Sequence, residues 1–294
     1  MRVLIFSDVH AISQATTALE EFLPTLNPDA IWFLGDMVGR GPSPHRVVRT
    51  IRAMLADYGG VAILGNHDMS VLGRLSGGGI QVGNQRLTED GFALNLLMQH
   101  RDHAECIQEY SASVWEWMNG LPLTAMPLAG YYLAHGYLSP TNLMRTIWDY
   151  GTKHEGILRE QVRTARATLD TPPSLIALGH YHIAGLWQWH DDQITTFDIW
   201  NREWIELDNL SERPVILNSG TLCLPRRDGD HGNYVILDLD DDLKSLRVGF
   251  RHLMFDWRPL LDVFRDGYVN AAQMRKEIRR NLLPPGIEPP EEGD

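Results

Sequence analysis

Five apolar segments of the sequence each end in a cluster of Asp, Asn or His residues. The clusters are Asp8-Val9-His10, Gly35-Asp36, Gly65-Asn66-His67-Asp68, His135-Gly136 and Gly179-His180-Tyr181-His182. A single Asp-x-His triplet arises by chance in many proteins, and an isolated histidine is most often a hydrogen-bonded structural residue. Burying this many titratable groups together costs several kcal/mol unless the groups are paired or hold a metal ion. The five clusters together therefore predict a metal site.

The types of side chain in these clusters narrow the choice of metal. Imidazole, carboxylate and amide oxygen together suit Mn, Fe, Zn or Ni, whereas Mg and Ca prefer oxygen ligands alone. The two cysteines, Cys106 and Cys223, lie outside the clusters, which disfavours a structural zinc site. We expect Mn²⁺ first, with Fe, Zn and Ni as alternatives.

The apolar segments before the first three clusters alternate with helical patterns. Buried strands are predicted at 2–7, 30–34 and 61–64, with helices at 15–26 and 47–58 between them. This alternation is typical of βαβ units and therefore of an α/β sheet. Open α/β sheets bind ligands beyond the carboxyl ends of their strands, which is where these clusters lie.

The second half of the chain is richer in predicted strands. They are expected at 131–134, 175–178, 194–197, 215–217, 234–238 and 246–252, with a long helix at 152–169. We expect the two halves to pack sheet against sheet with helices outside. Residues 1–283 are predicted to form one domain, with a helical cap-like insertion at 69–128. The Pro- and Glu-rich tail at 284–294 is predicted to be disordered.

Composition and charge restrict the cellular location and the binding partners that we expect for this protein. The 294 residues carry a formal net charge of −12, and long nucleic acid is disfavoured because duplex binding needs many Lys and Arg residues. A small phosphorylated partner is compatible with this charge, since bound cations reverse the field inside a site. The sequence has no membrane-length apolar stretch, no secretory pattern at its start and no disulfide framework, so we expect a cytoplasmic protein.

With their flanking residues, the five clusters resemble the motifs of the calcineurin-like metallophosphoesterases, in particular their bacterial and archaeal single-domain phosphodiesterase branch. The matching motifs are the D-x-H at Asp8 and His10, the GD at Asp36, the GNHD at Asn66 to Asp68, the HG at His135 and the GHYH at His180 and His182. The segment GDMVGRGPSP and the NSGT at 218–221, followed by Leu224-Pro225-Arg226, also resemble family segments. The resemblance spans roughly residues 1–255.

This resemblance implies a four-layer α-β-β-α sandwich of two mixed sheets and a centre of two divalent metal ions. It implies that Asp8, His10 and His182 hold one ion, that Asn66, His135 and His180 hold the other, and that Asp36 bridges them. A carboxylate has two oxygens, so Asp36 can ligate two cations about 3.5–4 Å apart. A water between such ions is acidified enough to be hydroxide near neutral pH, and this hydroxide would attack phosphorus in line with the leaving oxygen.

Four further residues receive roles from their place in the motifs. His67 resembles the family's non-ligand histidine, which contacts phosphate and can protonate the leaving group, a contribution of about 10²–10⁴-fold. We expect Asp68 to accept a hydrogen bond from His67 and to fix its tautomer. Arg40 is a candidate phosphate contact, with a solvated loop position as the alternative, and Arg226 is a candidate substrate contact.

The resemblance leaves the substrate open. We expect the protein to hydrolyse phosphodiesters, and a nucleotide is one candidate substrate. Phosphomonoesters are also candidates, because the same hydroxide can attack both kinds of ester. A dinucleoside polyphosphate or a phosphoprotein is the alternative substrate. A protein-binding scaffold is disfavoured because such relatives typically lose the histidine of GNHD, whereas His67 is present. A nuclease is disfavoured by the net charge. Tyr137-Leu138 replace the small residue and proline that are usual after HG, where substrate is expected to lie.

Overall fold

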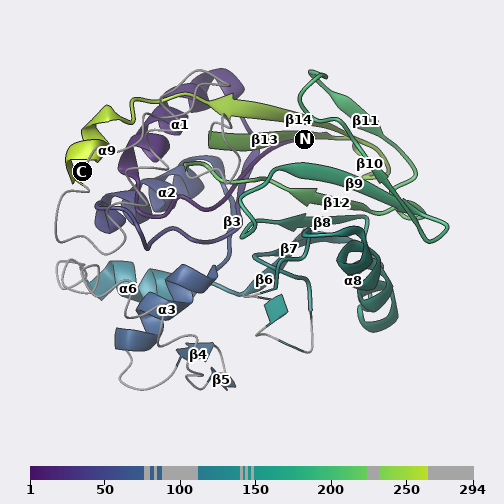
Figure 1. The fold of residues 1–294 in the computed structure, drawn as a ribbon, viewed down its shortest axis with the longest axis horizontal. Coiled ribbons are helices and arrows are strands. Elements are labelled where there is room, and N and C mark those ends of the chain that lie inside the picture. Colours follow the sequence, from purple (N-terminus) through teal and green to yellow (C-terminus); the bar gives the residue numbers. More distant parts are fainter. Residues whose placement is uncertain are drawn as a thin grey trace, which may run out of the picture.

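A computed structural model shows two packed β-sheets with helices on both outer faces (Figure 1). The structure describes residues 1–75, 80–82, 85–87, 112–139, 142, 145–146, 149–223 and 232–263. The predicted α/β architecture of two mixed sheets in four layers is confirmed. In these ranges, no helix has both the length and the apolar character that crossing a membrane requires.

The first sheet has the strand order β11-β14-β13-β1-β2-β3. Its strands are β1 (Arg2–Phe6), β2 (Ala30–Phe33), β3 (Gly60–Ala62), β11 (Ile205–Leu207), β13 (Gly232–Leu239) and β14 (Leu246–Leu253). Strands β1, β2 and β3 run parallel, because the helices α1 (Ser13–Leu26) and α2 (Pro44–Tyr58) connect them as crossovers. Strands β13, β14 and β11 are antiparallel to their neighbours.

The second sheet has the strand order β10-β9-β12-β8-β7-β6. Its strands are β6 (Thr124–Leu128), β7 (Tyr131–Ala134), β8 (Leu175–Leu178), β9 (Gly185–His190), β10 (Gln193–Thr196) and β12 (Val215–Asn218). Strands β7, β8 and β12 are parallel, and α8 (Glu155–Thr168) is the crossover between β7 and β8. Each sheet therefore has a parallel part whose strands end at the same edge.

The central strands are buried on both faces, so alternate residues face different cores. In β1, Val3 and Ile5 belong to the cluster between the two sheets, whereas Leu4 and Phe6 pack with residues of α1 and α2. On the other side, α8 packs against the outer face of the second sheet (Figure 1). Its buried residues Leu158, Val162 and Ala165 follow the helical period. A strand with two buried faces reads as a continuous apolar run, as predicted for β1, β2, β7 and β8.

The region predicted as a helical cap at 69–128 contains several kinds of element. It includes most of α3 (Asn66–Leu75), a hairpin of β4 (Ile80–Val82) and β5 (Gln85–Leu87), α6 (Ala112–Asn119), and β6. Residues 88–111 lie outside the described ranges, as does the tail at 284–294, so the cap and the disordered tail stay predictions. The last described element is α9 (Arg258–Val263).

Candidate metal centre

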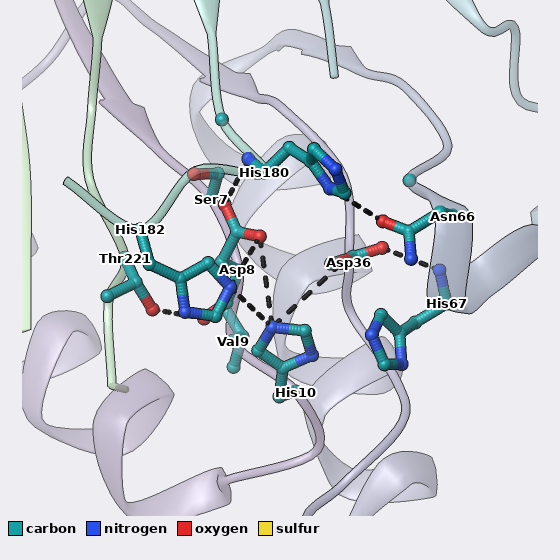
Figure 2. Close-up of polar contacts among 12 residues, drawn as sticks. Ser7, Asp8, Val9, His10, Asp36, Asn66, His67, His180, His182 and Thr221 are labelled. Atoms are coloured by element: carbon teal, nitrogen blue, oxygen red, sulfur yellow. Dashed lines mark hydrogen bonds and ion pairs between the residues drawn. The ribbon is translucent and has the colours of Figure 1, made fainter. Parts of the chain in front are cut away.

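The predicted ligands come together at one edge of the two sheets. Asp8 and His10 follow β1, Asp36 follows β2, and Asn66 begins α3 after β3. In the second sheet, His135 follows β7, and His180 and His182 follow β8. All seven side chains are buried, with at most 8% of each residue exposed. Figure 2 shows Asp8, His10, Asp36, Asn66, His180 and His182 turned toward one another.

One group consists of Asp8, His10 and His182. The Nε2 atoms of His10 and His182 lie 2.9 Å apart, and Asp8 Oδ1 lies 3.1 Å from His182 Nε2 and 3.8 Å from His10 Nε2. Atoms that each lie about 2.0–2.2 Å from one cation are roughly 3–3.5 Å apart, so this spacing fits a shared cation. Asp8 Oδ1 is buried without a hydrogen-bond partner, and a bound cation would compensate that oxygen.

A second group consists of Asn66, His135 and His180. Asn66 Oδ1 lies 3.0 Å from His135 Nε2 and 2.9 Å from His180 Nδ1. His135 Nδ1 donates to the carbonyl oxygen of Leu34, 2.7 Å away, because a carbonyl can only accept. This bond orients the ring and turns His135 Nε2 toward the group, the arrangement that metal-binding histidines commonly have.

Asp36 lies between the two groups (Figure 2). Its Oδ2 is 3.9 Å from His10 Nε2 and 3.3 Å from His135 Nε2. Its Oδ1 accepts a hydrogen bond from the backbone N–H of His67, 2.8 Å away. Oδ2 therefore lies near a histidine of each group, and the bridging role of Asp36 stays a prediction. The first-turn amide of α3, which has no partner within its own helix, engages Oδ1 and orients the carboxylate.

The charges in this centre shift the pKa values of its members. Burial disfavours a charge on His135, but the Asp36 carboxylate outweighs burial and raises the pKa of His135 to about 9. Burial also disfavours a charge on Asp8, yet the charge of the neighbouring His182 lowers the pKa of Asp8 below its ordinary value. For His10, burial and the charge of His67 lower the pKa well below its ordinary value. A neutral His10 beside an ionised Asp8 is suited to binding a cation.

The loops that present these ligands have strained backbone. Five of the seven have φ between 49° and 62°: Asp8, His10, Asp36, His180 and His182. A non-glycine residue in this left-handed region costs about 1–3 kcal/mol, and such residues cluster at functional sites. The residue types carry a weak signal of this strain, because Asp and His are enriched among non-glycine residues with positive φ but also occur in ordinary loops.

A family model described as calcineurin-like phosphoesterase matches residues 1–208, which include all seven converging side chains. The chain belongs to the calcineurin-like phosphoesterase family. Members of this family bind two divalent metal ions, and three groups of His and Asp residues here have ligand atoms within 4.8 Å of one another. Spacing, burial and donor types therefore fit the ions that the calcineurin-like phosphoesterase family uses.

Two solved structures have a similar fold. A metallophosphoesterase from Sphaerobacter thermophilus has a TM-score of 0.63 and 24% identity, covering 96% of this chain and 99% of that chain. A hypothetical protein from Pyrococcus horikoshii OT3 has a TM-score of 0.61 and 13% identity, covering 93% and 97%. At these identities the likeness shows the fold alone.

A curated relative carries a more specific name. The symmetrical bis(5'-nucleosyl)-tetraphosphatase of Aeromonas hydrophila subsp. hydrophila is 29% identical over 142 residues, which are 48% of this chain and 45% of that protein. The chain spans less than half the length of the curated relatives it matches.

The two predicted catalytic residues have different surroundings. The ring of His67 lies edge-on to that of His10, with centroids 4.7 Å apart. Asp68 does not accept from His67 as we expected. Its Oδ2 accepts from the backbone N–H groups of Asp36 (2.8 Å) and Gly65 (3.0 Å), and its Oδ1 accepts from Val38 N–H (3.1 Å). Burial, followed by the charge of Asp36, raises the pKa of Asp68 to about 7. Asp68 therefore joins two ligand loops instead of orienting His67.

Of the two predicted substrate contacts, Arg40 and Arg226, the structure describes only Arg40. The loop of Arg40 packs on the first ligand loop, because Gly41 N–H donates to the carbonyl oxygen of His10, 2.7 Å away. The charge of Arg40 is among the causes that lower the pKa of His10, so the guanidinium lies within electrostatic reach of the centre. Arg226 lies outside the described residues, and its role stays a prediction.

One residue outside the sequence motifs, Tyr150, supports a ligand. The ring of Tyr150 stacks on that of His180, with centroids 4.7 Å apart and an angle of 18° between the planes. Tyr137, which we placed where substrate would lie, is fully buried, and the guanidinium of Arg145 lies 4.1 Å from its ring centroid. Leu138 is buried as well. Tyr137 and Leu138 therefore pack inside the protein and do not form an open surface for substrate.

Proposed function

We propose that this protein is a phosphoesterase that hydrolyses small phosphodiesters, including nucleotides, with two divalent cations. The observation that supports the proposal is the convergence of seven buried ligand-type side chains in two groups with Asp36 between them. Asp8, His10 and His182 would hold one cation, and Asn66, His135 and His180 the other. When bound, the cations would activate water as a nucleophile and neutralise charge on the phosphate oxygens.

His67 and Arg40 are the residues that we assign to the substrate. His67 would donate a proton to the leaving oxygen, and Arg40 would bind a non-bridging phosphate oxygen through its guanidinium. Gly39 packs closely against His67. A Cβ at position 39 would lie only 2.4 Å from His67 Nδ1, so no larger residue fits there without displacing the ring. The backbone of this loop therefore lies directly against the imidazole and restricts its position.

A dinucleoside polyphosphate is the second candidate substrate. It is favoured by the similarity to bis(5'-nucleosyl)-tetraphosphatases of several bacteria. A phosphoprotein is a third candidate that the family membership permits. We propose Mn²⁺ as the cation in both sites, with Fe, Zn and Ni as alternatives, because the ligand set mixes imidazole with oxygen donors. A cytoplasmic location stays a prediction.

A reconstitution assay tests this function. The purified full chain is stripped of metal with a chelator and assayed with Mn²⁺, Fe²⁺, Zn²⁺ or Ni²⁺ on bis-p-nitrophenyl phosphate, p-nitrophenyl phosphate and diadenosine tetraphosphate. We expect turnover only with added cation, two cations bound per chain, and loss of turnover in Asp36→Asn. Asp191→Asn, at an exposed position, is the matched control. Absence of turnover with every cation would refute the proposal and favour a scaffold.

A further inference from the structure

The loop of residues 8–11 is held from two sides. Its N–H groups donate to the loop after β2: Asp8 to Gly35 O (3.0 Å), Val9 and His10 to Asp36 O (2.9 and 3.0 Å), and Ala11 to Met37 O (2.8 Å). Three of these four residues have positive φ: 55° at Asp8, 49° at His10 and 59° at Ala11. A backbone in this region persists only where its surroundings hold it, so the partners of its carbonyl groups matter as well.

The carbonyl oxygens of Asp8 and Val9 are held by the segment after β12. Thr221 Oγ1 donates to Asp8 O at 2.8 Å. Cys223 Sγ lies 3.3 Å from Asp8 O and 2.9 Å from Val9 O. Thr221 and Cys223 are both fully buried, so water does not replace these donors. The donor assignment follows from chemistry, because a carbonyl oxygen can only accept.

Thr221 is itself fixed, so it can transmit its position to Asp8. Its hydroxyl oxygen accepts from Cys223 N–H at 3.3 Å, and its carbonyl oxygen accepts from Asn233 N–H at 2.7 Å. The next residue, Leu222, donates its N–H to Ser7 O at 2.9 Å. The segment therefore links β12 of one sheet to the end of β1 in the other. Figure 2 shows Thr221 on the same side of the centre as Asp8 and His182.

We propose that Thr221, assisted by Cys223, is a positioning residue that sets the cation affinity of the Asp8–His10–His182 group. The inference rests on the proposed function, since it requires that this group binds a cation. The hydrogen bond from Thr221 fixes the peptide that follows Asp8. That peptide determines where Asp8 Oδ1 lies relative to His182 Nε2, 3.1 Å away. Because Thr221 donates directly to the backbone of Asp8, a ligand of this group, we expect its loss to weaken this site more than the Asn66–His135–His180 site.

Calorimetric titration of the metal-free protein with Mn²⁺ tests this selectivity. Thr221→Val keeps the shape of the side chain and removes the donor, whereas Thr221→Ser keeps the donor. We expect Thr221→Val to weaken one of two binding events about 10–100-fold, the usual effect of losing a partner that orients a ligand. Thr221→Ser should bind both cations within about threefold of the wild type. Thr16→Val is the matched control, because it removes another buried threonine hydroxyl, which donates to Ser13 O.

A second series of variants identifies which cation site is weakened and provides a replacement if Thr221→Val does not fold. In a His135→Ala background, which removes a ligand of the other group, the remaining event should still weaken when Thr221→Val is added. If circular dichroism shows that Thr221→Val does not fold, Cys223→Ala takes its place and should weaken the same event about threefold or more. Wild-type affinities in Thr221→Val, or equal weakening in Thr221→Ser, would overturn the inference. A wild-type chain that binds fewer than two cations would instead overturn the proposed function.

Discussion

Gly65 is the position at which one added methyl group would reach the carboxylate between the two ligand groups. A Cβ at position 65 would lie 2.1 Å from Asp36 Oδ1 and 2.4 Å from Asp36 N. Carbon atoms pack without repulsion at about 3.5 Å or more, so Gly65→Ala requires Asp36 to move by roughly 1 Å. Asp36 cannot turn away freely, because Oδ1 accepts from His67 N–H and the Asp36 N–H donates to Asp68.

The expected effects of Gly65→Ala follow from this displacement. Inserting an extra carbon into a packed interior costs about 1–3 kcal/mol, which in a chain of this size lowers Tm by roughly 2–4 °C per kcal/mol. A displacement of about 1 Å in a catalytic group can cost about 100-fold in rate. We therefore expect a folded variant whose kcat/KM on bis-p-nitrophenyl phosphate with Mn²⁺ is reduced about 100-fold, with weaker binding of both cations.

Gly156→Ala is the matched control for this experiment. It adds the same methyl group in the first turn of α8, where the nearest atom to the new Cβ is His154 Nδ1 at 3.3 Å. This variant should keep wild-type kcat/KM and bind two cations. The measurement compares cation content by elemental analysis, Tm by calorimetry, and initial rates for the three proteins. If Gly65→Ala retained both cations and a rate within threefold of the wild type, Asp36 would not have the central position that we assign to it.

Four further changes have defined outcomes. His67→Ala should lower turnover by about 10²–10⁴-fold while elemental analysis finds both cations, and loss of both would mean that His67 is a ligand. Asp68→Asn should lower the free energy of unfolding in urea by about 1–3 kcal/mol, because an amide nitrogen cannot accept from Val38 N–H; unchanged stability would contradict this. In the metal-free protein the pKa of His135 is raised to about 9, so a proton occupies the ring below that pH and competes with the cation. Affinity at the site of His135 should therefore fall about tenfold per pH unit from pH 8 to pH 6, and a pH-independent affinity in calorimetry would refute the competition. Arg40→Ala should raise KM about tenfold through loss of a charge-assisted contact, with cation content unchanged, and an unaltered KM would place Arg40 in solvent.

Four of the five strands that carry ligands, β1, β2, β7 and β8, were predictable because they are buried on both faces. Segments such as 175–178 and 131–134 are short apolar runs that end in Gly or His, and the structure confirms them as β8 and β7. Since parallel strands end at one edge of a sheet, the convergence of their polar ends also followed from the sequence. The proton competition at His135 did not follow, because it depends on the distance to Asp36.

Other strands were not predictable from local patterns. Strand β6 contains Pro127, which normally argues against a strand. It is tolerated because β6 is an edge strand whose register with β7 shifts between Ala125 and Leu128. Strand β11 has only three residues, and its assignment to the first sheet depends on pairing with β14. Pairing between segments so far apart in the chain is a property of the tertiary fold, and neither segment shows it alone.

The position of Asp68 shows why residue types identify a site better than they identify roles within it. A carboxylate next to His67 in the sequence has the right chemistry to orient an imidazole. Asp68, however, lies in the first turn of α3, where its oxygens reach the N–H groups of Asp36, Val38 and Gly65. Three amide donors compete more effectively for a buried carboxylate than one ring nitrogen, because each unpaired amide would cost about 1–3 kcal/mol.

The geometry of the ligands depends on tertiary contacts, because the strained loop at residues 8–11 is held by partners from distant parts of the chain. The N–H groups of residues 8–11 are held by the first sheet, whereas the carbonyl oxygens of Asp8 and Val9 are held by Thr221 and Cys223, which follow a strand of the second sheet. Neither sheet alone supplies both sets of partners. The left-handed conformation of the loop is therefore held by partners that come from both sheets. Cation affinity in this protein should consequently depend on contacts between the sheets as much as on the ligands themselves.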